Sequence, residues 1–418
     1  MTSEHHLYVG MVLPGETTPV PAALMKFARV NANEEGVFAY GKQYQKNPNA
    51  VALHPDIFPL NDTVALLPSN PIRDGGALPV VIQDALPDAW GRMVLASNNN
   101  NQGLTDIELL LQSNDDRVGA MVFSGSPQMP PNKLPQSHDI KALSEAIEKL
   151  QYGIELTDEL RRLLLLGGSL GGARPKASFI HDHALWLAKF PMRGDVADMQ
   201  IMECATLALA KACGIRVPQT LLIPAGASGY AMLTKRFDRH GPLTALSRIH
   251  YLSLSGFANV AYRSNNCSYV QFAILLNRLG SNAAADMKEL FIRMVFNMAV
   301  DNSDDHIKNH GVLYSGNGRF HLSPAFDMVP QLQNLGYTSL SIDGRTQNAH
   351  LDHARACAPK FGVTHDEANR LIHHILDTVH RHWYACFKAC NADKLLLEQV
   401  RDCFQRQMRN IGAPKEFC

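Results

Sequence analysis

Asp301-Asn302-Ser303-Asp304-Asp305-His306-Ile307-Lys308-Asn309 is the most informative stretch of this chain, because it places three acidic residues, a lysine and a terminal asparagine within nine positions. The run 290–300 precedes it directly, and its apolar residues recur at helical spacing: Leu290, Phe291, Met294, Val295 and Met298. Such a run predicts a buried helix. We therefore expect a helix that carries a charged loop to one fixed place.

The spacing of Asp304 and Asn309 in this loop is typical of phosphoryl-transfer enzymes. In kinases an Asp accepts the proton of the attacking hydroxyl, and an Asn five positions later holds a metal ion. A hairpin pattern over 311–322 follows, and then Ser323-Pro324-Ala325-Phe326-Asp327. A catalytic loop, a hairpin and a second Asp form the order in which protein kinases place these groups. The pattern favours a kinase-like site.

Two other interpretations of the loop remain open. In the first interpretation the loop is purely structural, because Asp, Asn and Ser are ordinary loop residues after a helix. In the second, His306 and His310 bind zinc, because His306-x-x-x-His310 has the spacing of two zinc ligands. A zinc hydrolase would need a Glu beside His306 and a helical segment, and neither pattern is present.

The composition is that of an ordinary globular protein. A chain of 418 residues can form two or three packed units. Lys and Arg number 39, as do Asp and Glu, so the formal net charge is zero and predicts no global attraction to nucleic acid. The N-terminus lacks a signal-peptide pattern, and no stretch approaches 18 uninterrupted apolar residues. We expect a cytoplasmic protein without membrane contact.

The eight cysteines argue against a disulfide framework and against a zinc ribbon, because they are scattered and form no Cys-x-x-Cys pair. His382, Cys386 and Cys390 do fall on one helical face. Packed thiols are favoured there over a metal site.

Turn-rich sequences divide the chain. Short apolar runs before residue 126 predict a small sheet with two helices, and the breaker-rich segment 126–132 marks the first boundary. Helical patterns dominate the last part of the chain, at 269–279, 283–300, 365–390 and 392–409. The expected domains are 1–126, 136–240 and 241–418, within an α+β fold.

The densest run of glycines is Gly167-Gly168-Ser169-Leu170-Gly171-Gly172-Ala173-Arg174-Pro175-Lys176. Glycines let a backbone approach phosphates closely. The run matches neither a Walker A loop nor a dinucleotide fingerprint, so a plain turn is the alternative. A predicted strand ending at Lys189 and a predicted helix 199–213 carrying Glu203 follow. Glycine loop, strand Lys and helix Glu follow each other in kinase small lobes. The alternatives are that Lys189 is a solvated strand end and that Glu203 lies on a solvated helix face.

Five stretches together resemble the HipA family, the serine/threonine kinase toxins of bacterial toxin–antitoxin modules. They occur in the family's order and span nearly the whole chain: Val118-Gly119-Ala120, Ser169-Leu170-Gly171-Gly172-Ala173-Arg174-Pro175-Lys176, Lys235-Arg236-Phe237-Asp238-Arg239, Asn302-Ser303-Asp304-Asp305-His306-Ile307-Lys308-Asn309 and Leu322-Ser323-Pro324-Ala325-Phe326-Asp327. The resemblance implies a bilobal, HipA/protein-kinase-like fold. Its N-terminal lobe would be mixed α/β and its C-terminal lobe mostly α. It also implies ATP and Mg²⁺ as cofactors.

The resemblance implies a role for individual positions. Asp304 looks like the catalytic base, and Asn309 and Asp327 look like the Mg²⁺ ligands. Ser169 looks like the family's autophosphorylated serine, whose phosphate adds nearly two negative charges beside the nucleotide pocket and would switch the enzyme off. The implied nucleotide-binding residues are Lys189, Gly171, Gly172, Ala173, Lys235, Phe237, His306 and Asn309.

The resemblance also implies partners. These are a protein substrate and a small HipB-like DNA-binding antitoxin, through which any DNA contact would be indirect. The best-known members phosphorylate an aminoacyl-tRNA synthetase, which makes such an enzyme a candidate substrate. The chain departs from the family at Lys235, where members often carry Glu, and in 248–256, which lacks the Glu-Asp pair of the best-known branch. The alternatives are a degenerate kinase that acts as a co-repressor and a metal-dependent phosphohydrolase.

Overall fold

The computed structural model describes residues 4–30, 33–69, 76–98, 103–114, 116–131, 139–167, 172–226, 229–262, 266–333 and 335–410. The chain forms two compact units, and each is built from two separate segments. Unit 1 comprises Met1–Lys189 and Arg236–Leu252, and unit 2 comprises Phe190–Lys235 and Ser253–Cys418. The three sequence-based domain ranges stay a prediction.

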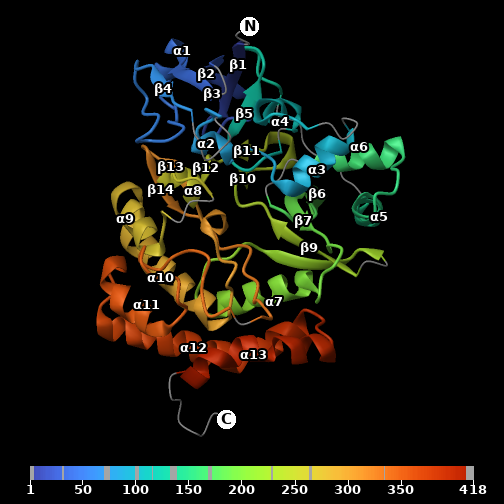
Figure 1. Cartoon of the computed structure of the whole chain (residues 1–418), viewed down its shortest axis with the longest axis vertical. Coiled ribbons are helices and arrows are strands. Elements are labelled where there is room, and N and C mark those ends of the chain that lie inside the picture. Colours follow the sequence, from blue (N-terminus) through green and yellow to red (C-terminus); the bar gives the residue numbers. More distant parts are fainter. Residues whose placement is uncertain are drawn as a thin grey trace. The chain divides into compact units, whose positions relative to one another are not determined.

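Unit 1 contains a five-stranded antiparallel sheet of order β4-β3-β2-β1-β5. Its strands are β1 (Glu4–Val12), β2 (Pro19–Val30), β3 (Asn33–Tyr40), β4 (Ala65–Leu67) and β5 (Met121–Ser124) (Figure 1). Alternate residues of β1 are fully buried, namely Leu7, Val9 and Met11. The sequence patterns missed β2, because Pro19 and Pro21 lack the N–H groups of a regular strand. The register shifts opposite Pro21.

The rest of unit 1 is short helices and hairpins, which makes this unit mixed α/β. The helices are α1 (Lys42–Gln45), α2 (Val80–Gln83), α3 (Ala89–Asn98), α4 (Asp106–Gln112), α5 (Ile140–Gln151), α6 (Asp158–Gly167) and η3 (Leu243–Ala245). The strands are β6 (Lys176–His181), β7 (Ala184–Lys189), β10 (Arg239–His240) and β11 (Ser247–Arg248), and the unit ends at Leu252, within β12 (Tyr251–Ser253). Thr105 and Glu108 cap α4 reciprocally, which fixes the start of this helix.

A buried ionic cluster joins two distant stretches of unit 1. The Asp238 carboxylate accepts the N–H of Gly119 at 2.8 Å and binds the guanidinium groups of Arg236 and Arg239 at 2.7 and 2.6 Å. Gly119 has φ +81°, and a Cβ there would lie 3.1 Å from the backbone nitrogen of Tyr251. Only glycine fits this position without strain. The sequences around residues 119 and 238 therefore depend on each other.

Unit 2 is mostly helical. Its helices are α7 (Met199–Ala212), α8 (Leu254–Ala258), α9 (Tyr269–Leu279), α10 (Ala283–Ala299), η4 (Ile307–Asn309), α11 (Leu351–Cys357), η5 (Ala358–Phe361), α12 (His365–Ala389) and α13 (Lys394–Asn410). Two antiparallel pairs complete it: β8 (Thr220–Pro224) with β9 (Tyr230–Lys235), and β13 (Gly311–Gly316) with β14 (Arg319–Leu322). The expected α+β fold, with a mixed first part and a mostly helical second part, is confirmed.

Helix α10 forms the centre of unit 2. Leu290, Phe291, Met294, Val295 and Met298 are all completely buried, so the apolar period seen in the sequence is the core face of this helix. Helix α10 packs against α9, α12 and α13, and α12 lies along α7 (Figure 1). The start of the charged loop is thereby fixed from several sides.

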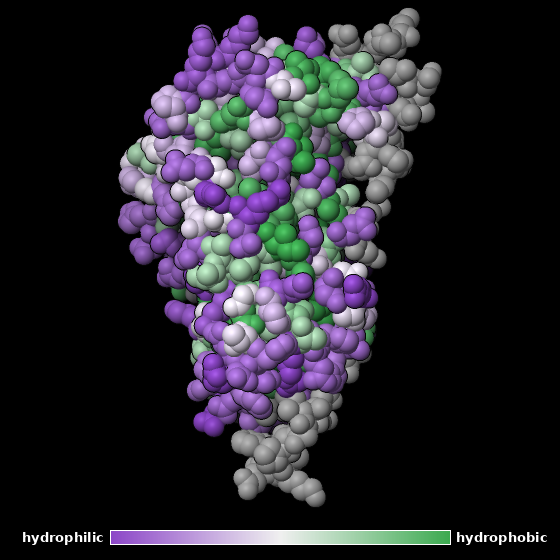
Figure 2. Space-filling model, turned by 90° about the vertical axis from the view of Figure 1, so that its left-hand side faces the viewer, coloured by the Kyte–Doolittle hydropathy of each residue, from purple (hydrophilic) through white to green (hydrophobic). Residues whose placement is uncertain are grey.

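The surface has an ordinary mixture of residue types. On the face shown in Figure 2, hydrophilic residues interrupt the hydrophobic ones. None of the helices in the described ranges is long and apolar enough to cross a membrane.

Candidate active site

The charged loop leaves α10 through a sharp backbone reversal. Asp301 adopts a left-handed conformation with φ 53°, which Asp tolerates better than most residues. The N–H of Asn302 then donates to the carbonyl of Asn297 at 2.9 Å. The loop ends in the 3-10 turn η4, followed directly by β13.

A buried polar network supports the loop from below. The Tyr269 hydroxyl donates to the Asp305 carboxylate and accepts from the Asn297 amide at 3.0 Å. Asn302 donates to Asn297 at 3.1 Å, and the His310 imidazole lies 3.0 Å from Asp305. Burial and the Asp305 carboxylate raise the pKa of Tyr269, so its hydroxyl keeps the proton that it donates. Asp305 is therefore an anchor of the loop.

A second set of contacts holds the loop through its backbone. The N–H and the hydroxyl of Ser339 both donate to the carbonyl of Ser303 at 2.9 Å. The N–H of Leu340 donates to the carbonyl of Asp305 at 2.7 Å. With residues 303 and 305 buried and bonded, Asp304 between them is the exposed residue.

Three of the predicted residues come together around Asp304. The Asn309 amide donates to the Asp304 carbonyl at 3.3 Å. Asp304 is exposed, yet enough protein surrounds its carboxyl that desolvation raises the pKa. His306 opposes this shift, while the carboxylates of Asp327 and Asp305 add to it. Asp304, Asn309 and Asp327 therefore lie near one another, with His306 beside them.

Glu203 supports Asp327 from helix α7. Its carboxylate accepts the N–H of Asp327 at 3.1 Å, and Asp327 has a left-handed backbone with φ 58°. Glu203 is 5% exposed, so the alternative of a solvated helix face is wrong. Sequence reasoning identified Glu203 by its order after Lys189, but it gave no sign of the contact with residue 327.

The predicted phosphate-binding residues that can be described lie in unit 1. Lys189 ends β7, is buried, and is the register partner of the buried Lys176 on β6. A solvated strand end is therefore wrong for Lys189. The N–H of Gly172 donates to the Asp88 carboxylate, and Gly172 has φ +110°. Ala173 is exposed beside it.

Four other positions were predicted to contact the nucleotide or to be phosphorylated. Ser169 and Gly171 lie outside the described residues. The Phe237 ring lies 6.3 Å from that of Tyr251, measured between centroids. Lys235 is exposed and its N–H donates to the carbonyl of Gln219. The meeting of Lys189 with Asp304 stays a prediction.

The ligand types fit Mg²⁺ better than Zn²⁺. Carboxylate and amide oxygens are what Mg²⁺ prefers, and this ion usually keeps waters and binds substrate phosphates as well. In the described parts of the chain, no group of three or more His, Cys, Asp or Glu residues could hold a metal ion. His310 faces Asp305, whereas the His306 ring packs edge-on against Tyr262. The zinc-hydrolase alternative therefore has no support.

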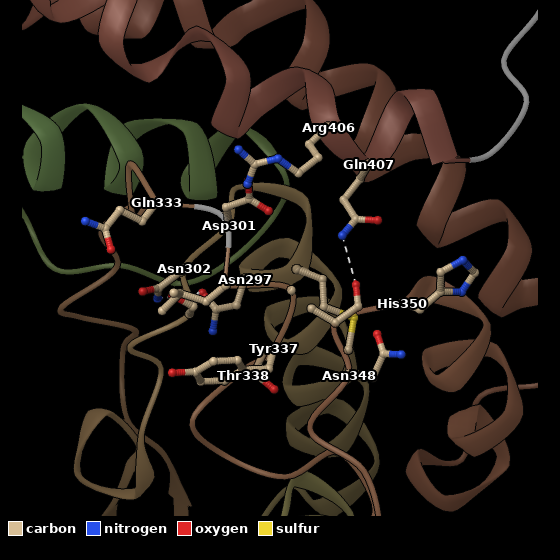
Figure 3. Close-up of a pocket in the computed structure, with 15 residues that line it drawn as sticks. Asn297, Asp301, Asn302, Gln333, Tyr337, Thr338, Asn348, His350, Arg406 and Gln407 are labelled. Atoms are coloured by element: carbon tan, nitrogen blue, oxygen red, sulfur yellow. Dashed lines mark hydrogen bonds and ion pairs between the residues drawn. The ribbon is translucent and has the colours of Figure 1, made fainter.

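A cavity of about 100 Å³ adjoins the other side of the loop. In Figure 3, Arg406 points toward Asp301, and Gln407 reaches to the chain between Asn348 and His350, where it donates to the carbonyl of residue 349 at 2.8 Å. Asn302 and Ser303 line this cavity, but Asp304, Asn309 and Asp327 do not. The cavity is thus separate from the predicted chemistry.

Three relatives, each carrying the name "Putative kinase", match parts of the chain. Y4dM of Sinorhizobium fredii is 27% identical over 158 residues, which are 34% of this chain and 37% of that protein. A Haemophilus influenzae protein is 28% identical over 162 residues, or 35% and 46%. Y4mE of Sinorhizobium fredii is 26% identical over 283 residues, or 61% and 64%. The matched part is less than two thirds of the length of each relative.

A solved structure is similar over nearly the full length. HipA of Shewanella oneidensis MR-1, solved in a complex with HipB and operator DNA, matches with a TM-score of 0.71 and 16% identity over 98% of this chain and 99% of that one. At this identity the likeness concerns the fold alone. The family model of the HipA N-terminal domain matches residues 25–124, and that of the HipA-like C-terminal domain matches 168–383. Because the second match alone covers more than half of the residues, the chain belongs to the HipA family.

Proposed function

We propose that the protein is an ATP- and Mg²⁺-dependent kinase that phosphorylates a serine or threonine hydroxyl of a protein. The observation that carries this proposal is the exposed Asp304 between two buried, bonded neighbours, with Asn309 and Asp327 beside it. Phosphoryl transfer depends mostly on positioning and charge neutralisation, and this arrangement would position the hydroxyl and hold the metal ion that neutralises the phosphates.

Asp304 would accept the proton of the attacking hydroxyl. Its raised pKa makes the carboxylate a better base than an ordinary surface Asp. Asn309 and Asp327 would hold Mg²⁺, which when bound supplies positive charge to the phosphates. The Glu203 carboxylate would fix Asp327 through its backbone N–H.

In unit 1, Lys189 would bind the ATP phosphates. Its register partner Lys176 is buried beside it, and side chains at paired positions share one face of a hairpin. Two ammonium groups on one face suit a polyphosphate. The backbone of Gly171, Gly172 and Ala173 would cover those phosphates, with Ser169 as the autophosphorylation site. Lys235, Phe237 and His306 would contact the rest of the nucleotide.

We also propose a HipB-like antitoxin as partner, with DNA contacted through it. This rests on family membership and on the whole-chain likeness to a HipA that was solved with HipB and operator DNA. An aminoacyl-tRNA synthetase is a candidate substrate by family analogy only. The same likeness favours the second candidate function, a co-repressor without kinase activity.

Labelled ATP separates the two functions. The full chain, incubated with labelled ATP and Mg²⁺, should incorporate phosphate at Ser169, and chelation of the metal should stop it. The tryptic peptide 163–176 contains Ser169 as its only hydroxyl side chain, so the site can be assigned directly. Asp304→Ala should reduce the rate by about 10²–10⁴-fold.

The matched control is Asp366→Asn, which changes an exposed acid in the first turn of α12 and should leave incorporation unchanged. No incorporation by the unmodified chain, together with retained antitoxin binding, would favour the co-repressor. Release of free phosphate without any phosphopeptide would favour a phosphohydrolase.

A further inference from the structure

Two cysteines from distant parts of the sequence meet between α7 and α12. The thiol of Cys390 is hydrogen-bonded to that of Cys204. Cys204 lies in the middle of α7, is 7% exposed, and also lies 3.6 Å from the hydroxyl of Thr220. Both cysteines are unbridged in this structure.

The backbone holds Cys390 at a fixed place. It caps the C-terminus of α12, where its N–H donates to carbonyls of the last turn, and the next residue, Asn391, has φ 64°. Cys390 is half-buried, so a small solute can reach the pair from its side. Helix α12 packs along α7, so the two cysteines lie on neighbouring elements.

The contact also makes one of the thiols reactive. The hydrogen bond from Cys390 outweighs burial and lowers the pKa of Cys204 below that of an ordinary thiol. The contact therefore favours the thiolate of Cys204, which is the form that reacts with oxidants. By contrast, burial raises the pKa of the neighbouring Cys213 to about 12, which leaves that thiol inert.

We propose that Cys204 and Cys390 form an oxidation site at which a hydroperoxide converts the two thiols into a disulfide linking α7 to the end of α12. The Cys204 sulfur attacks one peroxide oxygen, the O–O bond breaks, and the leaving oxygen takes a proton to form water or an alcohol. The Cys390 sulfur then attacks the resulting sulfenic acid, and the S–O bond breaks with loss of water. Two thiols are oxidised and one peroxide is reduced.

The surroundings favour a disulfide over a metal site. Within the described ranges no three metal-ligating side chains of the His, Cys, Asp and Glu types converge, although Cys213 and Cys386 are close by. Cys204 is also the chain neighbour of Glu203, whose carboxylate binds the N–H of Asp327. The disulfide would therefore form on the helix that supports the candidate active site. Its formation does not depend on the proposed kinase activity.

Peptide mapping tests the proposal on the reduced, full-length protein. Hydrogen peroxide is added in steps, free thiols are blocked with N-ethylmaleimide, and the protein is digested with trypsin without reduction. Cys204 and Cys390 fall in separate tryptic peptides, 194–211 and 389–394. We expect these two peptides to be cross-linked, with two of the eight thiols lost and both recovered by dithiothreitol.

Two variants sharpen the test. Cys390→Ser should abolish the cross-link and leave a sulfenic acid at Cys204 that dimedone traps. Cys386→Ser, one turn earlier on α12, is the matched control and should keep the cross-link. In urea the same peroxide treatment should lose the preference for this pair. Full maleimide labelling of peptide 194–211 after oxidation, or a cross-link between 212–216 and 382–388 instead, would overturn the proposal.

Discussion

Asp238→Asn should strongly destabilise unit 1, although it changes only one atom. Burial alone would raise the pKa of Asp238, but the guanidinium groups of Arg236 and Arg239 outweigh it and hold the pKa well below its usual range. The variant keeps the shape and removes the charge. It leaves the buried arginines Arg236, Arg239 and Arg248 around the carboxyl of Asp116.

The expected magnitude follows from this loss of charge balance. Breaking a buried ion pair by neutralising one partner costs about 3–5 kcal/mol. With a urea slope of about 2 kcal/mol per molar, the unfolding midpoint should fall by roughly 1.5–2.5 M. A carboxylate with a depressed pKa stabilises the fold above its unfolded pKa and loses this effect as pH falls toward its folded pKa. The difference in unfolding midpoint between Asp238→Asn and the unmodified protein should therefore narrow below about pH 4.

Tryptophan fluorescence is a suitable assay, because two of the three tryptophans, Trp90 and Trp186, are buried in unit 1. Urea titrations at pH 7 and at pH 3 give the midpoint of each protein. The control is Asp62→Asn, an exposed acid in the same unit, which should unfold with the unmodified protein. An Asp238→Asn midpoint within about 0.3 M of the unmodified one would refute the reasoning, since this corresponds to less than about 1 kcal/mol.

Three further predictions concern unit 2. Burial raises the pKa of Asp301 to about 6, so the folded chain holds a proton that the unfolded chain releases, and stability should fall by up to about 3 kcal/mol as pH rises from 4 to 6. Asp301→Asn should flatten the dependence of the melting temperature on pH over that range. A pH profile identical to that of the unmodified protein would contradict this. Tyr269→Phe leaves Asp305 without its hydroxyl partner and should cost about 1–3 kcal/mol, measured as a lower urea midpoint; an unchanged midpoint would count against the network. Glu203→Gln keeps an oxygen acceptor for the N–H of Asp327, whereas Glu203→Ala removes it. Calorimetry should therefore give weaker Mg²⁺-dependent ATP binding for the alanine variant than for the glutamine variant. Equal affinities of the two variants would exclude this role of Glu203.

Long periodic helices could be predicted from the sequence, and the discontinuous units could not. The patterns over 283–300 and 365–390 gave α10 and α12 to within one residue at each end, because each buries one continuous apolar face. Thr364 caps α12 by accepting the N–H of Glu367. The seven-residue α11 was missed, since two turns are too short to show a period. The return of 236–252 into unit 1 depends on contacts such as Asp238 with Gly119, which no local pattern contains.

In the candidate site, too, the sequence showed what depends on local spacing and did not show what depends on contacts between distant segments. Asp304 and Asn309 could be proposed as base and metal ligand from the sequence, because that pattern is a spacing of five residues within one loop. The partners that hold the loop, Tyr269 and Ser339, come from other segments and carry no local signal. The contact between Glu203 and Asp327 joins residues 124 positions apart. The sequence thus indicated candidate groups for the chemistry and left out most of the contacts that hold them.

The two adjacent acids of the loop illustrate why support and chemistry must be separated. Asp304 and Asp305 are chemically identical, and in the loop sequence only the spacing of five residues to Asn309 distinguishes them. The structure adds an independent difference, because Tyr269 and His310 contact the side chain of residue 305 and the N–H of Leu340 donates to its carbonyl. Residues 303 and 304 form a turn in which residue 305 faces inward and residue 304 is exposed. The reactivity proposed for Asp304 is therefore a consequence of the buried contacts of its neighbour.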